Sequence, residues 1–175
     1  MAMAKRSRGF PPIAAPDARL LILGSLPGQM SLARQQYYAQ PQNAFWRIMG
    51  VLFGAGLDVP YEQRAGILMA NRIALWDVCK AASRPGSLDS SIDPHSVIAN
   101  DFRRFFREHR EVEAVCTNGG TATRLYARLV HPKLPAGARA IPVHPLPSTS
   151  PAHASMRFDE KLARWRALLD YLARD

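Results

Sequence analysis

A short apolar segment that ends in a glycine- and proline-rich loop constrains the fold more than any other feature of this chain. Leu20 to Leu23 indicates a buried strand, and the loop that follows, Gly24-Ser25-Leu26-Pro27-Gly28, cannot continue as a regular helix. In an open α/β sheet, ligands bind at the carboxyl ends of the strands. We therefore expect a functional site where this first strand ends.

Segments typical of strands and of helices alternate along the rest of the chain. Apolar runs predict further strands at residues 73–77, 112–117 and 138–143. The spacing of apolar side chains predicts a helix beginning after Asn43, and others at residues 61–71, 96–110, 119–129 and 155–173. This alternation predicts an α/β protein, with three α/β/α layers around a central, mostly parallel four-stranded sheet. We expect a single domain over residues 1–175, with a flexible basic segment at residues 1–16.

The balance of charge points to a polyanionic partner. The 23 Lys and Arg residues outnumber the 14 Asp and Glu residues, which gives a formal net charge of +9. Such an excess of positive charge favours binding to nucleic acid. A basic surface that is only solvated is the alternative, and composition alone does not separate the two.

Cysteine spacing and hydropathy argue against metal-binding and membrane classes. Cys79 and Cys116 match no paired metal motif such as Cys-x-x-Cys, so we expect two reduced, buried thiols and no metal. No apolar run reaches the length of a membrane span, and residues 1–8 lack the apolar region of a signal peptide. We expect a cytoplasmic protein without membrane contact, associated with the nucleoid if its source is prokaryotic.

Four sequence blocks carry a resemblance to a known family. They are the loop at residues 24–28 followed by Gln36-Tyr37-Tyr38-Ala39-Gln40-Pro41-Gln42-Asn43-Ala44-Phe45-Trp46, then Ala74-Leu75-Trp76-Asp77-Val78, Gly86-Ser87-Leu88-Asp89-Ser90-Ser91-Ile92 and Leu146-Pro147-Ser148-Thr149-Ser150-Pro151-Ala152. In this order the blocks resemble the uracil-DNA glycosylase superfamily and, within it, the hypoxanthine-DNA glycosylase branch. The resemblance implies a uracil-DNA glycosylase-like fold that needs no cofactor.

The function implied by the resemblance is base excision repair. The expected enzyme is a monofunctional DNA glycosylase that flips a deaminated base out of double-stranded DNA and hydrolyses its N-glycosidic bond. Hypoxanthine is the favoured base and uracil the second. No lysine occupies a motif position from which it could attack the sugar, so strand cleavage should not accompany base release. The alternatives are a glycosylase specific for uracil or for G:U or G:T mismatches, and a non-catalytic relative that binds damaged DNA.

The resemblance also indicates one catalytic side chain. Many relatives carry a polar residue at the third position of the first loop and at the start of the last block, where this chain has Leu26 and Leu146. Neither leucine can form a side-chain hydrogen bond. In the hypoxanthine branch, an asparagine of the first block is implicated in catalysis, and it corresponds to Asn43. The alternative is that Asn43 only caps the helix that follows it.

Base-binding residues are expected around the same strand ends. Tyr38 matches the position where an aromatic ring stacks on the extruded base; the alternative is a core tyrosine, a place that Tyr37 suits better. Asp77 ends the second predicted strand and either accepts a hydrogen bond from a base N–H or caps the strand. The full set expected to contact the base is Ser25, Leu26, Tyr38, Trp76 and Asp77.

A hydroxyl-rich loop near the end of the chain is the expected DNA contact. Ser148, Thr149 and Ser150 lie between two prolines and suit the binding of phosphates beside the extruded nucleotide, although such loops are also ordinary turns. His153 stands where relatives commonly have asparagine, and it is a further candidate for contact with DNA.

Two other classes of protein fit the sequence poorly. The loop around Ser25 lacks the Gly-x-Ser-x-Gly order of a serine hydrolase. Neither Gly-x-Gly-x-x-Gly nor a lysine-bearing phosphate loop follows the first strand, which argues against a nucleotide-binding module.

Overall fold

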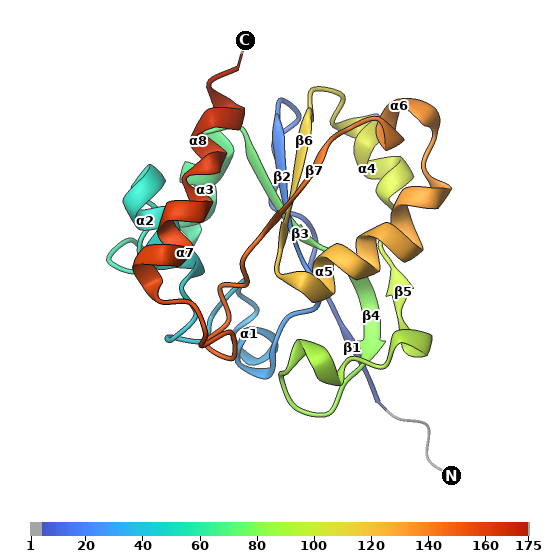
Figure 1. The fold of residues 1–175 in the computed structure, drawn as a ribbon, viewed down its shortest axis with the longest axis horizontal. Helices are drawn as coiled ribbons and strands as arrows, with labels where there is room; N and C mark the ends of the chain where they lie inside the picture. Colours follow the sequence, from blue (N-terminus) through green and yellow to red (C-terminus); the bar gives the residue numbers. More distant parts are fainter. Residues whose placement is uncertain (1–4, 175) are drawn as a thin grey trace.

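Four parallel strands form the central sheet (Figure 1). The computed structural model describes residues 5–174. The order of the strands across the sheet is β3-β2-β6-β7. The bounds are Leu20–Gly24 for β2, Ile73–Asp77 for β3, Ala114–Asn118 for β6 and Val143–Leu146 for β7. The predicted α/β class with a mostly parallel four-stranded sheet is confirmed.

Alternate residues of β2 supply two separate apolar cores. Leu20 and Ile22 face a core that contains Phe45, Trp46 and Trp165, whereas Leu21 and Leu23 face the core on the opposite side of the sheet. All four side chains are at most 1% exposed. A strand buried on both faces is typical of a parallel sheet covered by helices on both sides, so the apolar run at this point in the sequence has a direct structural cause.

Helices cover both faces of the sheet and give the three layers that the sequence predicts (Figure 1). On one face lie α2 (Phe45–Phe53), α3 (Tyr61–Ala70), α7 (Phe158–Trp165) and α8 (Ala167–Leu172). On the other lie α4 (Phe102–Glu108), α5 (Gly120–Leu125), the π-helical turn η3 (Tyr126–Val130), the 3₁₀ helix η4 (His131–Lys133) and α6 (Ala136–Arg139). The described helices include none that is long and apolar enough to cross a membrane.

A small antiparallel sheet lies beside the main one and includes the N-terminal segment. Its order is β1-β4-β5, with bounds Arg6–Arg8, Cys79–Ser83 and Ile98–Ala99. Arg6–Arg8 pairs with residues 81–83, and Ile13 forms a bridge to Leu75. The expectation of a flexible segment at residues 1–16 is therefore not met at these positions, while residues 1–4 lie outside the described part.

Three predicted elements have different bounds in the structure. The strand predicted at residues 138–143 lies instead at Val143–Leu146, because residues 136–139 form α6. The helix predicted at residues 96–110 is interrupted: the side chain of Asp101 accepts a hydrogen bond from the N–H of Arg104 and starts α4 only there. The predicted C-terminal helix is divided at Arg166 into α7 and α8.

The carboxyl ends of the parallel strands meet at one edge of the sheet. Gly24 at the end of β2 is paired in register with Asp77 at the end of β3, and Asn118 at the end of β6 with Leu146 at the end of β7. The short helix α1 (Gln29–Arg34) and the 3₁₀ helices η1 (Asp89–Ser91) and η2 (Pro94–Ser96) follow the segments that leave the sheet near this edge. This edge is where the sequence predicts the functional site.

Candidate active site

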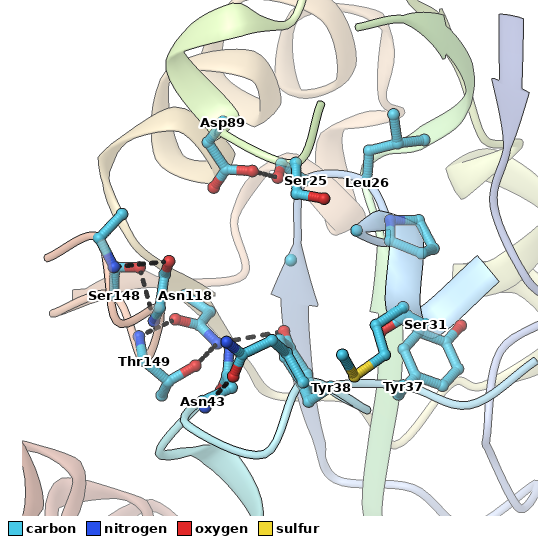
Figure 2. A pocket seen from close by; sticks show the side chains of 18 of the residues that line it. Ser25, Leu26, Ser31, Tyr37, Tyr38, Asn43, Asp89, Asn118, Ser148 and Thr149 are labelled. Carbon is cyan, nitrogen blue, oxygen red and sulfur yellow. Dashed lines mark hydrogen bonds between the residues drawn. The ribbon is translucent and has the colours of Figure 1, made fainter. Parts of the chain in front are cut away.

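A pocket of about 440 Å³ opens at the carboxyl edge of the central sheet (Figure 2). Strand ends form part of its lining, and the segments at residues 24–31, 37–43, 87–89 and 148–152 complete it. All four sequence blocks that resemble glycosylases therefore contribute lining residues to one cavity, the second of them through Asp77. A volume of this size is in the range of small-molecule sites and suits an extruded nucleotide.

The loop after β2 is fastened to the loop at residues 84–92. The guanidinium of Arg84, whose side chain is 1% exposed, donates to the carbonyl oxygens of Pro27 at 2.5 Å and Leu26 at 3.4 Å. Arg84 also pairs with the carboxylate of Asp89 at 3.6 Å, and the hydroxyl of Ser25 donates to that carboxylate at 2.6 Å. Ser25 and Leu26 both line the pocket, so this cluster fixes one wall of the cavity.

Both paired tyrosines line the pocket, but Tyr37 is also a buried member of the apolar core, whereas Tyr38 is only partly buried. Tyr37 is 4% exposed and its hydroxyl donates to the carbonyl oxygen of Pro11 at 2.8 Å. Tyr38 has a left-handed backbone (φ 53°), which is uncommon for a residue other than glycine. Its ring stacks on Phe45 with centroids 4.2 Å apart, and it lines the pocket. Burial raises the pKa of the Tyr38 hydroxyl well above its usual value, so this group stays protonated.

Asn118, which follows the strand predicted at residues 112–117 and was not among the expected site residues, is central to the pocket. Its Nδ2 donates to the hydroxyls of Tyr38 at 3.1 Å and Thr149 at 3.0 Å, and its Oδ1 accepts from the N–H of Thr149 at 3.0 Å (Figure 2). One buried amide thus joins β6, the Tyr38 segment and the loop at residues 148–150. The available signal was its place at a strand end, the same signal that identified Asp77.

Gly119, immediately after Asn118, allows the loop at residues 148–150 to approach. Its φ of 92° favours glycine, and a Cβ at this position would lie 2.9 Å from the Cβ of Ser148. Gly119 is therefore needed for contact between two distant segments as well as for a turn.

Asn43 lies directly before α2, and the orientation of its amide is fixed. Its Oδ1 accepts a hydrogen bond from the N–H of Phe45 at 2.9 Å, while the neighbouring Ala44 N–H donates to the carbonyl oxygen of Thr149 at 2.9 Å. Ala44 occupies the N-cap position of the helix, so Asn43 binds the first turn from one residue further out. No residue of the described chain engages Asn43 Nδ2, and Asn43 lines the pocket. The amide therefore binds the helix through its oxygen and keeps a free donor.

The carboxyl group of Asp77 is buried in the floor of the pocket. Asp77 is 4% exposed, and its Oδ2 has no hydrogen-bond partner among the described residues. Burial and the nearby Asp89 carboxylate raise the pKa of Asp77 to about 7. Gly24 makes room for it, because a Cβ there would collide with Asp77 Oδ1 and lie 2.8 Å from the Tyr38 hydroxyl.

Two expected site residues lie away from the cavity. Trp76 is 7% exposed, donates to the carbonyl oxygen of Phe10 at 3.0 Å and packs against Phe102 and Phe105, so the expectation that it lines the pocket is not met. Its side chain points to the face of the sheet opposite to that of Leu75. His153 is half-buried beyond the lining residues, and its N–H donates to the carbonyl oxygen of Ser150.

The hydroxyl-rich loop combines turn geometry with access to the pocket. The hydroxyl oxygens of Ser148 and Ser150 accept hydrogen bonds from the N–H groups of Ser150 at 3.1 Å and Ala152 at 3.2 Å. Each hydroxyl still has a proton to donate. Thr149 differs, because it is 1% exposed and its hydroxyl accepts a hydrogen bond from Asn118 Nδ2. Its side chain therefore holds the loop in place from the inside. Within residues 5–174, no three His, Cys, Asp or Glu side chains gather in a way that could hold a metal ion.

Known proteins similar to this chain include two curated proteins named hypoxanthine DNA glycosylase. The one from Methanosarcina acetivorans is 44% identical over 116 residues, which are 66% of this chain and 72% of that protein. The one from Methanosarcina barkeri is 42% identical over 93 residues, which are 53% of this chain and 59% of that protein.

A solved structure and a family model extend the similarity to almost the whole chain. A solution NMR structure from Methanosarcina acetivorans, described as a candidate uracil DNA glycosylase, has a TM-score of 0.79 and 36% identity; the match covers 97% of this chain and 100% of that one. Residues 11–170 match the family described as the Uracil DNA glycosylase superfamily. The family predicted from the four sequence blocks is confirmed, and the chain belongs to the uracil DNA glycosylase superfamily.

Proposed function

We propose that this chain acts as a single-domain, monofunctional DNA glycosylase on double-stranded DNA that contains a deaminated base, with hypoxanthine as the favoured base. Membership of the superfamily supports base excision as the reaction, and the names of the two Methanosarcina relatives support hypoxanthine as the base. A base within a duplex is inaccessible, so the nucleotide must rotate out of the helix into the pocket, which costs a few kcal/mol.

Tyr38 is the proposed stacking surface for the extruded base. One side of its ring is supported by Phe45, and its hydroxyl is held by Asn118, so the ring is fixed before the base arrives. Stacking of a base on an aromatic ring contributes ~1–3 kcal/mol, which offsets much of the cost of extrusion. Ser25, Leu26 and Asp77 border the same cavity and complete the proposed base site.

Asn43 is the proposed catalytic residue, and its role is that of a donor. When the N-glycosidic bond breaks, its electron pair moves to the base, which gains negative charge while the sugar becomes oxocarbenium-like. Because Oδ1 of Asn43 is bound to the N–H of Phe45, the amide presents Nδ2 to the cavity and can donate to an acceptor of the departing base. Water then adds to the sugar carbon and releases its proton to solvent.

The reaction should be largely dissociative. The two positions at which many relatives have polar side chains hold Leu26, which lines the pocket, and Leu146, which is 8% exposed in the core. Neither can activate water, and an amide is too weak a base to do so near neutral pH. No lysine lines the cavity among the described residues, which supports base release without strand cleavage.

Contacts with the DNA backbone are proposed for Ser148 and Ser150, whose hydroxyl protons are free to donate to phosphates, and for His153 beside them. Thr149 supports this loop from within. The net charge of +9 supplies the non-specific attraction. We predict that affinity for undamaged duplex falls with salt, with a log–log slope of about −0.9 per neutralised phosphate. A flat response in a fluorescence-anisotropy titration would contradict this prediction.

The observation that carries the proposal is the free Nδ2 of Asn43 in the same cavity as the Tyr38 ring. The test is a panel of end-labelled duplexes, each with one hypoxanthine, uracil, xanthine or mismatched thymine, incubated with the protein and then treated with alkali. We expect alkali-dependent breaks at hypoxanthine, and no break before alkali is added. A preference for uracil or for mismatches would replace hypoxanthine as the substrate. Binding without breaks on any duplex would favour the non-catalytic alternative.

A further inference from the structure

Among residues 5–174, the carboxyl group of Asp77 is the one buried side-chain group of the pocket with an oxygen that lacks a hydrogen-bond partner. Its Oδ2 has no partner among residues 5–174, although Asp77 lines the cavity and is 4% exposed. Its polar neighbours are engaged elsewhere: the amide of Asn118 with Tyr38 and Thr149, and the hydroxyl of Ser25 with Asp89. A buried polar atom without a partner destabilises the empty pocket, so a ligand that supplies the partner is favoured.

Within residues 5–174, no cation forms an ion pair with this carboxyl; the charge of Arg84 lowers the pKa of Asp77, but burial and the Asp89 carboxylate outweigh this effect. Arg84 is directed to the carbonyl oxygens of Leu26, Pro27 and Gly86 and pairs with Asp89 instead. Asp89 adds a second carboxylate on the same side of the cavity. The remaining titratable groups around Asp77 are Tyr37, Tyr38 and the thiol of Cys79, and burial, followed by the charge of Asp77, raises the pKa of each. These three groups are therefore neutral and offer no positive charge.

We propose that Asp77 binds the extruded base as a neutral carboxylic acid, donating its proton to a carbonyl oxygen of the base and accepting a ring N–H through its other oxygen. This inference rests on the proposed function, because it assumes that the pocket holds a base. Hypoxanthine has a carbonyl oxygen and a ring N–H side by side, and a protonated carboxyl group has one donor and one acceptor in the same arrangement. An ionised carboxylate would place two acceptors against the carbonyl oxygen of the base.

The proposal predicts a dependence on pH with a definite sign. Burial and Asp89 raise the pKa of Asp77 to about 7, so the neutral acid dominates below that value and disappears above it. Base release should therefore decline as pH rises through this range, by about tenfold per pH unit well above the pKa. Removing the negative charge of Asp89 lowers the pKa of Asp77, so Asp89→Asn should shift the decline to lower pH.

The first test compares single-turnover release of hypoxanthine by the wild-type protein, Asp77→Asn and Asp77→Leu from about pH 5.5 to about pH 9. An amide keeps one donor and one acceptor at every pH, so Asp77→Asn should lose the decline and exceed the wild type by about tenfold or more near pH 8.5. Asp77→Leu should be slow throughout, with melting temperatures confirming that both variants fold. Ionisation of the base affects all three proteins equally. A decline that persists in Asp77→Asn, or is absent from the wild type, would overturn the proposal.

The second test does not require turnover. The carboxyl carbon of Asp77 is titrated by NMR in the full chain, alone and with free hypoxanthine. A base that binds the neutral acid must raise the pKa of Asp77 further, because binding and protonation are linked. A pKa that falls or stays unchanged on saturation with hypoxanthine would overturn the proposal. If this pKa rises but no duplex in the panel loses a base, the proposed enzymatic function fails while the assignment of Asp77 stands.

Discussion

The two sides of the pocket are built on opposite principles. On the amide side, formed by Tyr38, Asn43, Asn118 and Thr149, hydrogen bonds within the described chain hold both amides and leave Asn43 Nδ2 available to donate to a ligand. On the carboxyl side, formed by Ser25, Asp77, Arg84 and Asp89, two carboxyl groups share the wall with a single arginine, and a buried oxygen of Asp77 stays unpaired.

The difference indicates separate tasks for the two sides. A side chain held by several hydrogen bonds does not reorganise during the reaction, so the amide side is suited to stabilising the charge of the departing base. An unpaired buried oxygen costs about 1–3 kcal/mol in the empty pocket, and a bound base recovers part of this energy. The carboxyl side is therefore suited to selecting the base.

Removing the free donor of the amide side should have the largest effect. Asn43→Ala should lower single-turnover base release by ~10²-fold or more, the scale measured when one transition-state hydrogen-bond donor is lost. Binding of the damaged duplex should change little. The control is Gln42→Ala, an exposed neighbour outside the pocket. A rate for Asn43→Ala equal to that of the control would remove Asn43 from the mechanism.

Replacing the ring of the amide side should have the next largest effect. Tyr38→Leu should weaken processing of the damaged base by about tenfold through lost stacking, whereas Tyr38→Phe should be mild because the aromatic face remains. Tyr37→Phe is the matched control: it removes the hydrogen bond to Pro11 and should lower the melting temperature with little change in rate. If Tyr38→Leu behaved like Tyr37→Phe, the ring would belong to the core.

Replacing Asn118, the amide that joins β6 to Tyr38 and Thr149, should reduce the stability of the fold. Asn118→Ala leaves the N–H of Thr149 unpaired and frees the hydroxyl of Tyr38, which should reduce the free energy of unfolding by about 1–3 kcal/mol. Thermal denaturation measures this loss. Asn71→Ala, an exposed amide that binds only its own helix, should stay within ~0.5 kcal/mol. Equal losses in the two variants would show that the buried network does not hold the amide side together.

The smallest effect is expected for Ser148, the pocket residue next to Thr149 of the amide side. Ser148→Ala removes one neutral donor to phosphate, and should weaken duplex binding by about threefold while the dependence on salt stays the same. A change in the salt slope would mean that the substitution disturbs charged contacts as well.

Local patterns in the sequence were sufficient to predict the strands that lead to the site. Leu20–Gly24 and Ile73–Asp77 are apolar runs buried on both faces, and residues that end them line the pocket. The last strand was misplaced, because His144 and Pro145 are atypical of a strand and are tolerated only at the sheet edge that β7 forms.

The parts of the site that sequence analysis missed depend on contacts between distant residues. Asn118 binds residues 80 and 31 positions away, and no local pattern distinguishes such an asparagine from one in a turn.

Trp76 was assigned to the pocket from its place near a strand end, but the alternation of side chains along β3 directs it to the opposite core. The contact of Asn43 with the helix uses Oδ1, and the proposed catalytic role uses Nδ2, so the two roles do not compete for the same atom.

The measurement that tests this account most directly is the single-turnover rate of Asn43→Asp on a hypoxanthine-containing duplex. A carboxylate keeps the oxygen that accepts from the N–H of Phe45, so the helix start and the melting temperature should be preserved. It lacks the donor, so we predict a rate as low as that of Asn43→Ala, at least ~10²-fold below the wild type. A rate for Asn43→Asp near that of the wild type would contradict the claim that the amide side acts through the Nδ2 donor of Asn43.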